Sequence, residues 1–259
     1  MSSTETTSEP VTEHLDTAHL PTLYADRSFW GMVTTQFLGA FNDNLFKQLI
    51  LLLSITVAVG GATEDNQGTA TLIFSLPFLL VTGIAGYLAD RFPKRSIIVL
   101  CKVAEVVIMA LGALAFSRYS QSHSLLFLYF VLFLMGSHSG FFGPAKYGIL
   151  PEILRDDDLP RANGFILMTT FVAIISGTVV AGIILDFFPG KLWVGSTACI
   201  LTAVLGTLSA LFVRKVPAAN SQLKLQASSF AVPPDMMRMT LSRQEPSADA
   251  ASSVIGSRV

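Results

Sequence analysis

Six apolar runs, each about as long as a bilayer is thick, constrain this chain more than any other feature. They cover residues 29–59, 69–89, 96–117, 124–142, 163–187 and 193–213. Because a backbone in lipid must satisfy its own N–H and C=O groups, such runs predict helices and not open strands. The composition agrees, since the chain is 51% hydrophobic and 14% charged, with a mean hydropathy of +0.58. We therefore expect an all-α membrane protein with six transmembrane helices.

The connections between the runs differ in their Lys and Arg content. If the N-terminus is inside, the outer loops carry two cations, Arg118 and Lys191. The inner segments then carry nine, namely Arg27, Arg91, Lys94, Arg95, Lys146, Arg155, Arg161, Arg214 and Lys215. Cytoplasmic loops hold an excess of Lys and Arg, so the pattern predicts that both ends of the six-helix region face the cytoplasm.

The two ends of the chain differ from its centre. Residues 1–28 are polar and acidic and lack the basic start and short apolar core of a signal peptide, and residues 216–259 are rich in Pro, Ser and Ala. We expect disordered cytoplasmic tails at 1–28 and 216–259 around a six-helix unit at 29–215. A net charge of −1 gives no basic footprint for nucleic acid. Cys101 and Cys199 lie in apolar runs without metal-ligand spacing, so neither a metal nor a cofactor is expected.

An internal repeat relates the two halves of the apolar region. The pattern G-x-x-x-D-x-F-P closes the second run at residues 86–93 and recurs 96 residues later at 182–189. The same offset carries the Phe-Leu pair at 37–38 onto 133–134. Because three spans per repeat reverse the direction of the chain, the offset predicts two inverted three-helix repeats. Chance similarity between Gly- and Phe-rich helix ends is the alternative.

The first run contains ionisable residues where charge is expensive. Asp43 and Lys47 lie within it, and a charge at the bilayer centre costs about 2.5 to 3.5 kcal/mol on insertion scales. Gln36 recurs with them on one helix face, and Asn42 and Asn44 add polarity. Asp43 is therefore the first candidate for a functional site, with Asn44 and Lys47 beside it. In the alternative interpretation Asp43 and Lys47, four residues apart, only neutralise each other.

The third and fourth runs also carry polar residues. Lys102 and Glu105 lie three residues apart in the third run, where they can pair with each other or complement Asp43 across the bundle. His138 in the fourth run can relay protons or form a hydrogen bond within the packing. The sequence leaves both pairs of alternatives open.

The inner end of the fourth run predicts a shaped site. Lys146 follows Pro144 there and can contact a lipid phosphate or snorkel to the anionic leaflet. The neighbouring Gly143, Pro144 and Gly148 predict a broken helix end. Asn163 is placed to cap the fifth helix.

Small residues mark a packing face on the fifth helix. Gly177, Ala181 and Gly182 predict a seam along which this helix packs closely against a neighbour.

The loop between the second and third runs reads G-Y-L-A-D-R-F-P-K-R and resembles the signature loop of the major facilitator superfamily. On this resemblance it is a conformational-switch loop formed by Gly86, Asp90, Arg91, Lys94 and Arg95. A glycine such as Gly86 permits close helix approach, and an aspartate can pair with a cation or a helix N-terminus. The sequence departs from the usual pattern at Pro93, where a glycine is common.

Three segments carry a narrower resemblance. They are F-L-G-A-F-N-D-N at 37–44, G-P-A-K-Y-G-I-L-P-E at 143–152 and R-A-N-G at 161–164. Together they resemble the lysophospholipid transporter branch of that superfamily, whose members flip lysophospholipids across the bacterial inner membrane. In some bacteria these transporters are fused to an acyltransferase and an acyl-carrier synthetase. The resemblance covers the membrane region and implies the N-terminal six-helix half of a transporter.

The resemblance implies a transporter, not an enzyme, that works by alternating access in the bacterial inner membrane. The substrate site then comprises Asp43, Asn44, Lys47, Glu105 and Lys146. Expected partners are a lysophospholipid, membrane lipids, a second six-helix half from another copy or a separate chain, and an acyltransferase. A non-transporting scaffold that docks an acyltransferase, a truncated half and a transporter of another amphipathic solute remain alternatives.

Overall fold

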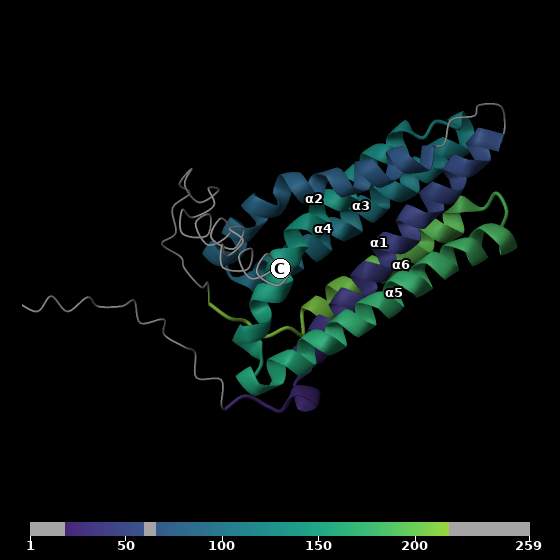
Figure 1. Ribbon diagram of the computed structural model, residues 1–259. Helices are drawn as coiled ribbons and strands as arrows, with labels where there is room; N and C mark the ends of the chain where they lie inside the picture. Colours follow the sequence, from purple (N-terminus) through teal and green to yellow (C-terminus); the bar gives the residue numbers. More distant parts are fainter. Residues whose placement is uncertain (1–18, 60–65, 218–259) are drawn as a thin grey trace, which may run out of the picture. The chain divides into compact units, whose positions relative to one another are not determined.

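The computed structural model describes residues 19–59 and 66–217, which fold into six long helices (Figure 1). These are α1 (Arg27–Val59), α2 (Asn66–Arg91), α3 (Lys94–Ser122), α4 (Leu126–Ile153), α5 (Leu159–Phe187) and α6 (Leu192–Ala210). Two short 3₁₀ turns, η1 (Leu23–Ala25) and η2 (Asp156–Asp158), precede α1 and α5. The described residues contain no strand, so the all-α prediction is confirmed. Of the tails predicted at 1–28 and 216–259, residues 1–18 and 218–259 lie outside the described residues.

Length and hydropathy suit these helices to a membrane. In the described part of the chain five helices, α2 to α6, are long and apolar enough to cross one. The remaining helix, α1, has 33 residues and is therefore about 50 Å long, but polar residues between 36 and 48 lower its mean hydropathy. The helix that departs from the apolar pattern is thus the one that carries Asp43.

The helices pack as two related sets of three. α4 packs along α2 and α3, α1 packs along α5 and α6, and α3 contacts α6 (Figure 1). Exchanging α1, α2 and α3 for α4, α5 and α6 leaves this pattern unchanged. Such packing is the arrangement expected for two inverted three-helix repeats, each of which completes the other.

Two glycines bring helix backbones into close contact. A Cβ on Gly136 of α4 would lie 2.2 Å from the carbonyl oxygen of Phe74 in α2. A Cβ on Gly177 of α5 would lie 2.5 Å from the carbonyl oxygen of Phe41 in α1. The predicted seam on α5 is therefore confirmed at Gly177 and at the fully buried Ala181. It is wrong at Gly182, because nothing lies within 4 Å of its Cβ position.

The predicted break in the fourth helix is wrong. α4 continues to Ile153 with Pro144 and Pro151 inside it, so Gly143, Pro144 and Gly148 lie within a continuous helix. Proline removes one N–H group, but neighbouring helices and local adjustment can satisfy the freed carbonyl in a membrane bundle. Lys146 is therefore held on a helix face and not on an irregular end.

The predicted cap of the fifth helix is also wrong. α5 begins at Leu159, so Asn163 lies inside its first turns and cannot occupy the capping position. Asp158 takes that position without a side-chain hydrogen bond, and Pro160 follows in the first turn, where a missing N–H group costs nothing. At the other end, Gly190 adopts a φ of 74°, which favours glycine and lets the chain turn into α6.

Packing begins before the first apolar run. Leu23 is buried, and Asp26 accepts a hydrogen bond from Arg214 at 3.2 Å. The Arg214 backbone N–H also donates to the Ser28 hydroxyl at 3.1 Å. The start of α1 is thus tied to the segment after α6.

The hydrophobic core is divided into two clusters. One contains residues 45–53 of α1, the end of α3 from Ile108 and the start of α4 up to Met135. The other contains the start of α1 up to Val33, α3 up to Cys101 and α4 from Phe142. Polar side chains fill the level between the clusters, and this level is the candidate site.

Candidate functional site

A layer of six polar residues crosses the bundle between the two hydrophobic clusters. We call it the polar layer: Asn42 and Asp43 from α1, Lys102 and Glu105 from α3, and His138 and Ser139 from α4. The α1 and α4 pairs are separated by the repeat offset of 96 residues. Ser139 donates a hydrogen bond to Asp43 Oδ2 at 2.6 Å. Equivalent positions of the two repeats therefore meet at the centre.

Glu105 is the hub of this layer. Its carboxylate accepts hydrogen bonds from Lys102 Nζ at 2.6 Å and from Asn42 Nδ2 at 2.7 Å. His138 Nε2 lies 3.6 Å from the same carboxylate. Lys102 and Glu105 are only 2% and 1% exposed, so this ion pair is buried inside the bundle. Of the two alternatives for these residues, the structure contains the mutual pair.

Asp43 is left with unused hydrogen-bonding capacity. Its Oδ1 atom is buried and has no hydrogen-bond partner among the described residues. Lys47 forms no direct ion pair with it among the described side chains. The Lys47 ammonium instead lies 5.1 Å from the centroid of the Phe74 ring. A buried carboxylate oxygen without a partner is costly, which favours a ligand at this position.

A cavity of about 190 Å³ opens beside Asp43. Its wall comes from four helices, α1 to α4. The lining residues are Gln36, Gly39, Ala40, Asp43, Phe78, Lys102, Glu105, His138, Ser139, Phe142, Gly143 and Lys146. Ion-paired, unpaired and aromatic side chains therefore line the same cavity.

Lys146 supplies a second group with free capacity. It is 8% exposed, and its ammonium lies 4.2 Å from the centroid of the Tyr147 ring. No acidic side chain pairs with it among the described residues. Lys146 follows Ser139 by seven residues on α4, which corresponds to about 10 Å along the helix axis. The cavity therefore offers an acceptor at Asp43 and a cation at Lys146.

The predicted substrate residues divide into two groups. Asp43, Glu105 and Lys146 line the cavity together. Lys47 does not line it, and the Asn44 amide donates to the Ala40 carbonyl oxygen of its own helix at 2.8 Å. Sequence reasoning missed Ser139, although the 96-residue offset that relates it to Asp43 was visible.

Gly39 was also missed. Because it has no side chain, it leaves room for Lys102 in the polar layer. A Cβ at this position would lie 2.3 Å from Lys102 Nζ. The ammonium of Lys102 therefore packs directly against the α1 backbone and lies 5.1 Å from the centroid of the Phe142 ring. Its place beside Glu105 depends on a glycine in α1.

Two of the three basic residues of the predicted switch loop contact other parts of the bundle. Lys94 is buried and forms an ion pair with Glu152 of α4. Arg95 donates to the carbonyl oxygens of Val213 at 2.6 Å and Leu211 at 3.0 Å. The start of α3 is thereby tied to the ends of α4 and α6.

The first part of that loop is more open. Asp90 and Arg91 are exposed, and Arg91 donates to the Tyr87 hydroxyl at 2.5 Å. Gly86 was expected to allow close helix approach, but nothing lies within 4 Å of its Cβ position. That expectation is wrong for the described bundle.

Comparison with known proteins agrees with this architecture. Residues 28–254 match the Major Facilitator Superfamily profile. The chain is 26% identical over 212 residues to the lysophospholipid transporter LplT of Photorhabdus laumondii, covering 79% of this chain and 48% of that protein. It is 28% identical over 200 residues to the protein of the same name from Yersinia pestis, covering 75% of this chain and 44% of that protein.

The chain spans about half the length of these curated relatives. The matched region contains all six helices and the polar layer. The helices, their packing in two repeats and the profile match over most of the chain lead to one assignment. The chain belongs to the major facilitator superfamily.

Proposed function

We propose that this chain is one half of a transporter that moves lysophospholipids across the bacterial inner membrane by alternating access. The observation that carries the proposal is the cavity in which a carboxylate oxygen of Asp43 and the ammonium of Lys146 have no hydrogen-bond or ion-pair partner among the described residues. The names of the relatives support lysophospholipid as the substrate class.

The two free groups suit a zwitterionic head group. The ammonium of an ethanolamine head group would pair with Asp43, and the phosphate would pair with Lys146. Charged groups that are desolvated in a bundle need such partners, and the ligand would supply both. The acyl chain would remain in an apolar environment, because the layer is bounded by hydrophobic clusters on both sides.

The Lys102–Glu105 pair would serve as a fixed support for this site. Glu105 is already occupied by Lys102 and Asn42, which leaves it little capacity for a substrate. Its bond to Asn42 and its proximity to His138 connect α3 to the helices that carry Asp43 and Ser139. In this role Glu105 positions the cavity wall and does not hold the head group.

A complete pathway would require a second six-helix half beside the described bundle. The positive-inside pattern supports an orientation with both ends of the described bundle in the cytoplasm. Exposed apolar side chains along α2 and α5, among them Leu79, Leu72, Ile175 and Phe171, would face lipid or that second half. An acyltransferase that reacylates the imported lipid would be a further partner.

Flipping of fluorescent lysophosphatidylethanolamine in proteoliposomes tests the proposal, with the full chain at several protein-to-lipid ratios. Asp43→Asn is expected to reduce the flipping rate at least tenfold, because the amide cannot pair with the head-group ammonium. Asp186→Asn is the matched control, since Asp186 is an exposed carboxylate at the end of α5. Circular dichroism and size-exclusion profiles establish that each variant is folded.

The dependence of the flipping rate on protein density tests whether another copy of this chain can act as the second half. If copies of this chain assemble, flipping should rise more steeply than linearly with density. Equal flipping by the Asp43→Asn variant and the unaltered chain would remove Asp43 from the site. Absence of flipping by folded chain, together with stable binding of an acyltransferase, would favour a scaffold role instead.

A further inference from the structure

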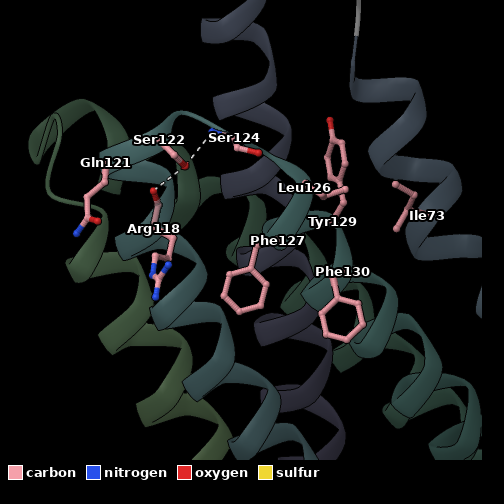
Figure 2. Close-up of a pocket in the computed structure, with 9 residues that line it drawn as sticks. All are labelled: Ile73, Arg118, Gln121, Ser122, Ser124, Leu126, Phe127, Tyr129 and Phe130. Atoms are coloured by element: carbon pink, nitrogen blue, oxygen red, sulfur yellow. Dashed lines mark hydrogen bonds between the residues drawn. The ribbon is translucent and has the colours of Figure 1, made fainter.

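A second and larger cavity lies far from the polar layer, where α3 turns into α4. Its volume is about 840 Å³, and Figure 2 shows its wall. The lining residues are Ile73, Arg118, Gln121, Ser122, Ser124, Leu126, Phe127, Tyr129 and Phe130. None of them belongs to the site described above, so this cavity, which we call the α3–α4 pocket, needs an explanation of its own.

The α3–α4 pocket combines an unpaired cation with polar and aromatic surfaces. Arg118 forms no ion pair with any described acidic side chain. Ser122, Ser124 and Gln121 line the turn side of the pocket, where the Ser124 N–H donates to the Ser122 hydroxyl at 3.3 Å and that hydroxyl donates to the Arg118 carbonyl oxygen at 3.0 Å. The Arg118 guanidinium, which points away from the turn, is suited to a phosphate, because Arg binds phosphate through paired N–H donors.

The opposite wall is apolar. The Phe127 and Phe130 rings lie 6.5 Å apart and are inclined by only 21°, so they form one continuous strip along α4. Figure 2 shows the Arg118 side chain and both rings pointing the same way, away from the turn, while Tyr129 points in the opposite direction. A ligand with a phosphate at Arg118 would therefore lay an apolar tail along the rings. One strip of this kind fits a single acyl chain.

The location suits a lipid from the outer leaflet. Arg118, near the end of α3, and Lys191, in the separate α5–α6 connection, are the two cations that the charge pattern places outside. The α3–α4 turn then lies at head-group depth. Along α4, Phe130 precedes Ser139 by nine residues, about 13 Å of helix. The pocket is thus well separated from the central cavity along the direction in which a lipid would move.

We propose that the α3–α4 pocket binds a lysophospholipid of the outer leaflet, with its phosphate on Arg118 and its acyl chain on Phe127 and Phe130. The inference rests on the proposed transport function and orientation, and it deepens them by naming where substrate is collected before it reaches the central cavity. A volume of several hundred cubic ångströms is in the range of ligand pockets.

Photolabelling tests this site directly. The full chain is placed in phosphatidylcholine nanodiscs with lysophosphatidylethanolamine that carries a diazirine in its acyl chain. After irradiation, mass spectrometry measures labelling of the peptide that contains residues 126–130. Arg118→Gln is expected to lower this labelling about tenfold, and Arg118→Lys is expected to retain most of it. Lys191→Gln, the matched loss of an outer cation, should leave it unchanged.

Competition identifies the ligand. Unlabelled lysophosphatidylethanolamine should compete, whereas monoacylglycerol, which lacks the phosphate, should compete at least tenfold more weakly. Equal competition by monoacylglycerol, or full labelling of Arg118→Gln, would overturn the role of Arg118. Equal competition by diacyl phosphatidylethanolamine would overturn the assignment to a single-chain lipid and leave a general bilayer-lipid site.

The Asp43→Asn variant separates this inference from the transport proposal. It should stop flipping but leave labelling at residues 126–130 unchanged, because the pocket does not use Asp43. If labelling falls in Arg118→Gln but the unaltered chain does not flip lipid, transport would be refuted and the binding site would stand. Flipping without any labelling of the pocket would refute the site alone.

Discussion

Replacing Glu105 with Gln should destabilise the bundle more than any other single change of charge in the polar layer. Gln has nearly the same shape as Glu and keeps an oxygen that can accept the Asn42 hydrogen bond, which is 2.7 Å long. What is lost is the negative charge that lies 2.6 Å from Lys102 Nζ. The Gln NH₂ group, itself a donor, then faces the Lys102 ammonium, so the change removes both the charge and the hydrogen bond of the pair.

The expected magnitude follows from burial. Both partners are nearly inaccessible to solvent, at 2% for Lys102 and 1% for Glu105, so solvent does little to screen the charge left behind. Removing one partner of a buried ion pair costs about 3 to 5 kcal/mol, because the other charge remains unpaired in a medium of low dielectric constant. Replacing both partners with neutral residues is far less costly. We therefore expect Lys102→Met to restore much of the stability that Glu105→Gln removes.

A double-mutant cycle measures this effect. The full chain is unfolded reversibly with SDS in mixed micelles, and the fluorescence of Trp30 and Trp193 reports the transition. This gives the free energy of unfolding for the two single variants and the double variant. The prediction is a coupling energy of about 2 kcal/mol or more. Single variants as stable as the unaltered chain, with no coupling between them, would show that Lys102 and Glu105 do not support one another in the folded bundle.

Three further predictions concern helix packing and its link to the site. Gly136→Ala would place a Cβ 2.2 Å from an α2 carbonyl oxygen and should lower the free energy of unfolding by about 1 to 3 kcal/mol in the same assay. The control Gly182→Ala should be neutral, because nothing lies within 4 Å of that Cβ position. Equal effects of the two variants would refute the close approach of α4 to α2. Gly39→Ala should displace the Lys102 ammonium and slow flipping severalfold, and a rate equal to that of the unaltered chain would contradict this positioning role. Arg95→Gln removes donors to the carbonyl groups that follow α6 and should speed amide hydrogen exchange there severalfold, while exchange in the middle of α6 stays unchanged.

The sequence was sufficient to predict the helices, because apolar length and backbone satisfaction in lipid leave few alternatives. Each of the six predicted runs corresponds to one long helix, and the repeat offset agrees with the packing of α2 on α4 and α5 on α1. The ends of the helices were harder to predict. α4 passes through Pro144, because a proline in a membrane bundle need not end a helix, and α5 begins before Asn163, with Pro160 in its first turn.

The candidate site could be predicted in part. A charged residue in an apolar run drew attention to Asp43, and the structure places it in a cavity wall with Glu105 and Lys146. Which groups pair could not be predicted, because helix rotation decides it. Lys47, four residues from Asp43, turns to the Phe74 ring, and Ser139 from α4 supplies the hydrogen bond to Asp43.

Some glycines were beyond sequence reasoning for a similar reason. Gly39 and Gly86 look alike in the sequence, yet one lies under a buried ammonium and the other has open space at its Cβ position. Only the position of the neighbouring helix separates a glycine that is required from one that is not.

The most direct test of the central claim compares head groups at the central cavity. Native mass spectrometry would measure the binding of lysophosphatidylethanolamine and of lysophosphatidic acid, which has no ammonium. The proteins compared are the unaltered chain, Asp43→Asn and Lys146→Gln. Each also carries Arg118→Gln, which removes binding at the α3–α4 pocket. We expect Asp43→Asn to weaken binding of the zwitterionic lipid alone, by about tenfold, and Lys146→Gln to weaken binding of both lipids. Equal losses for the two lipids in Asp43→Asn, or no loss in either variant, would contradict the claim that this cavity holds the head group.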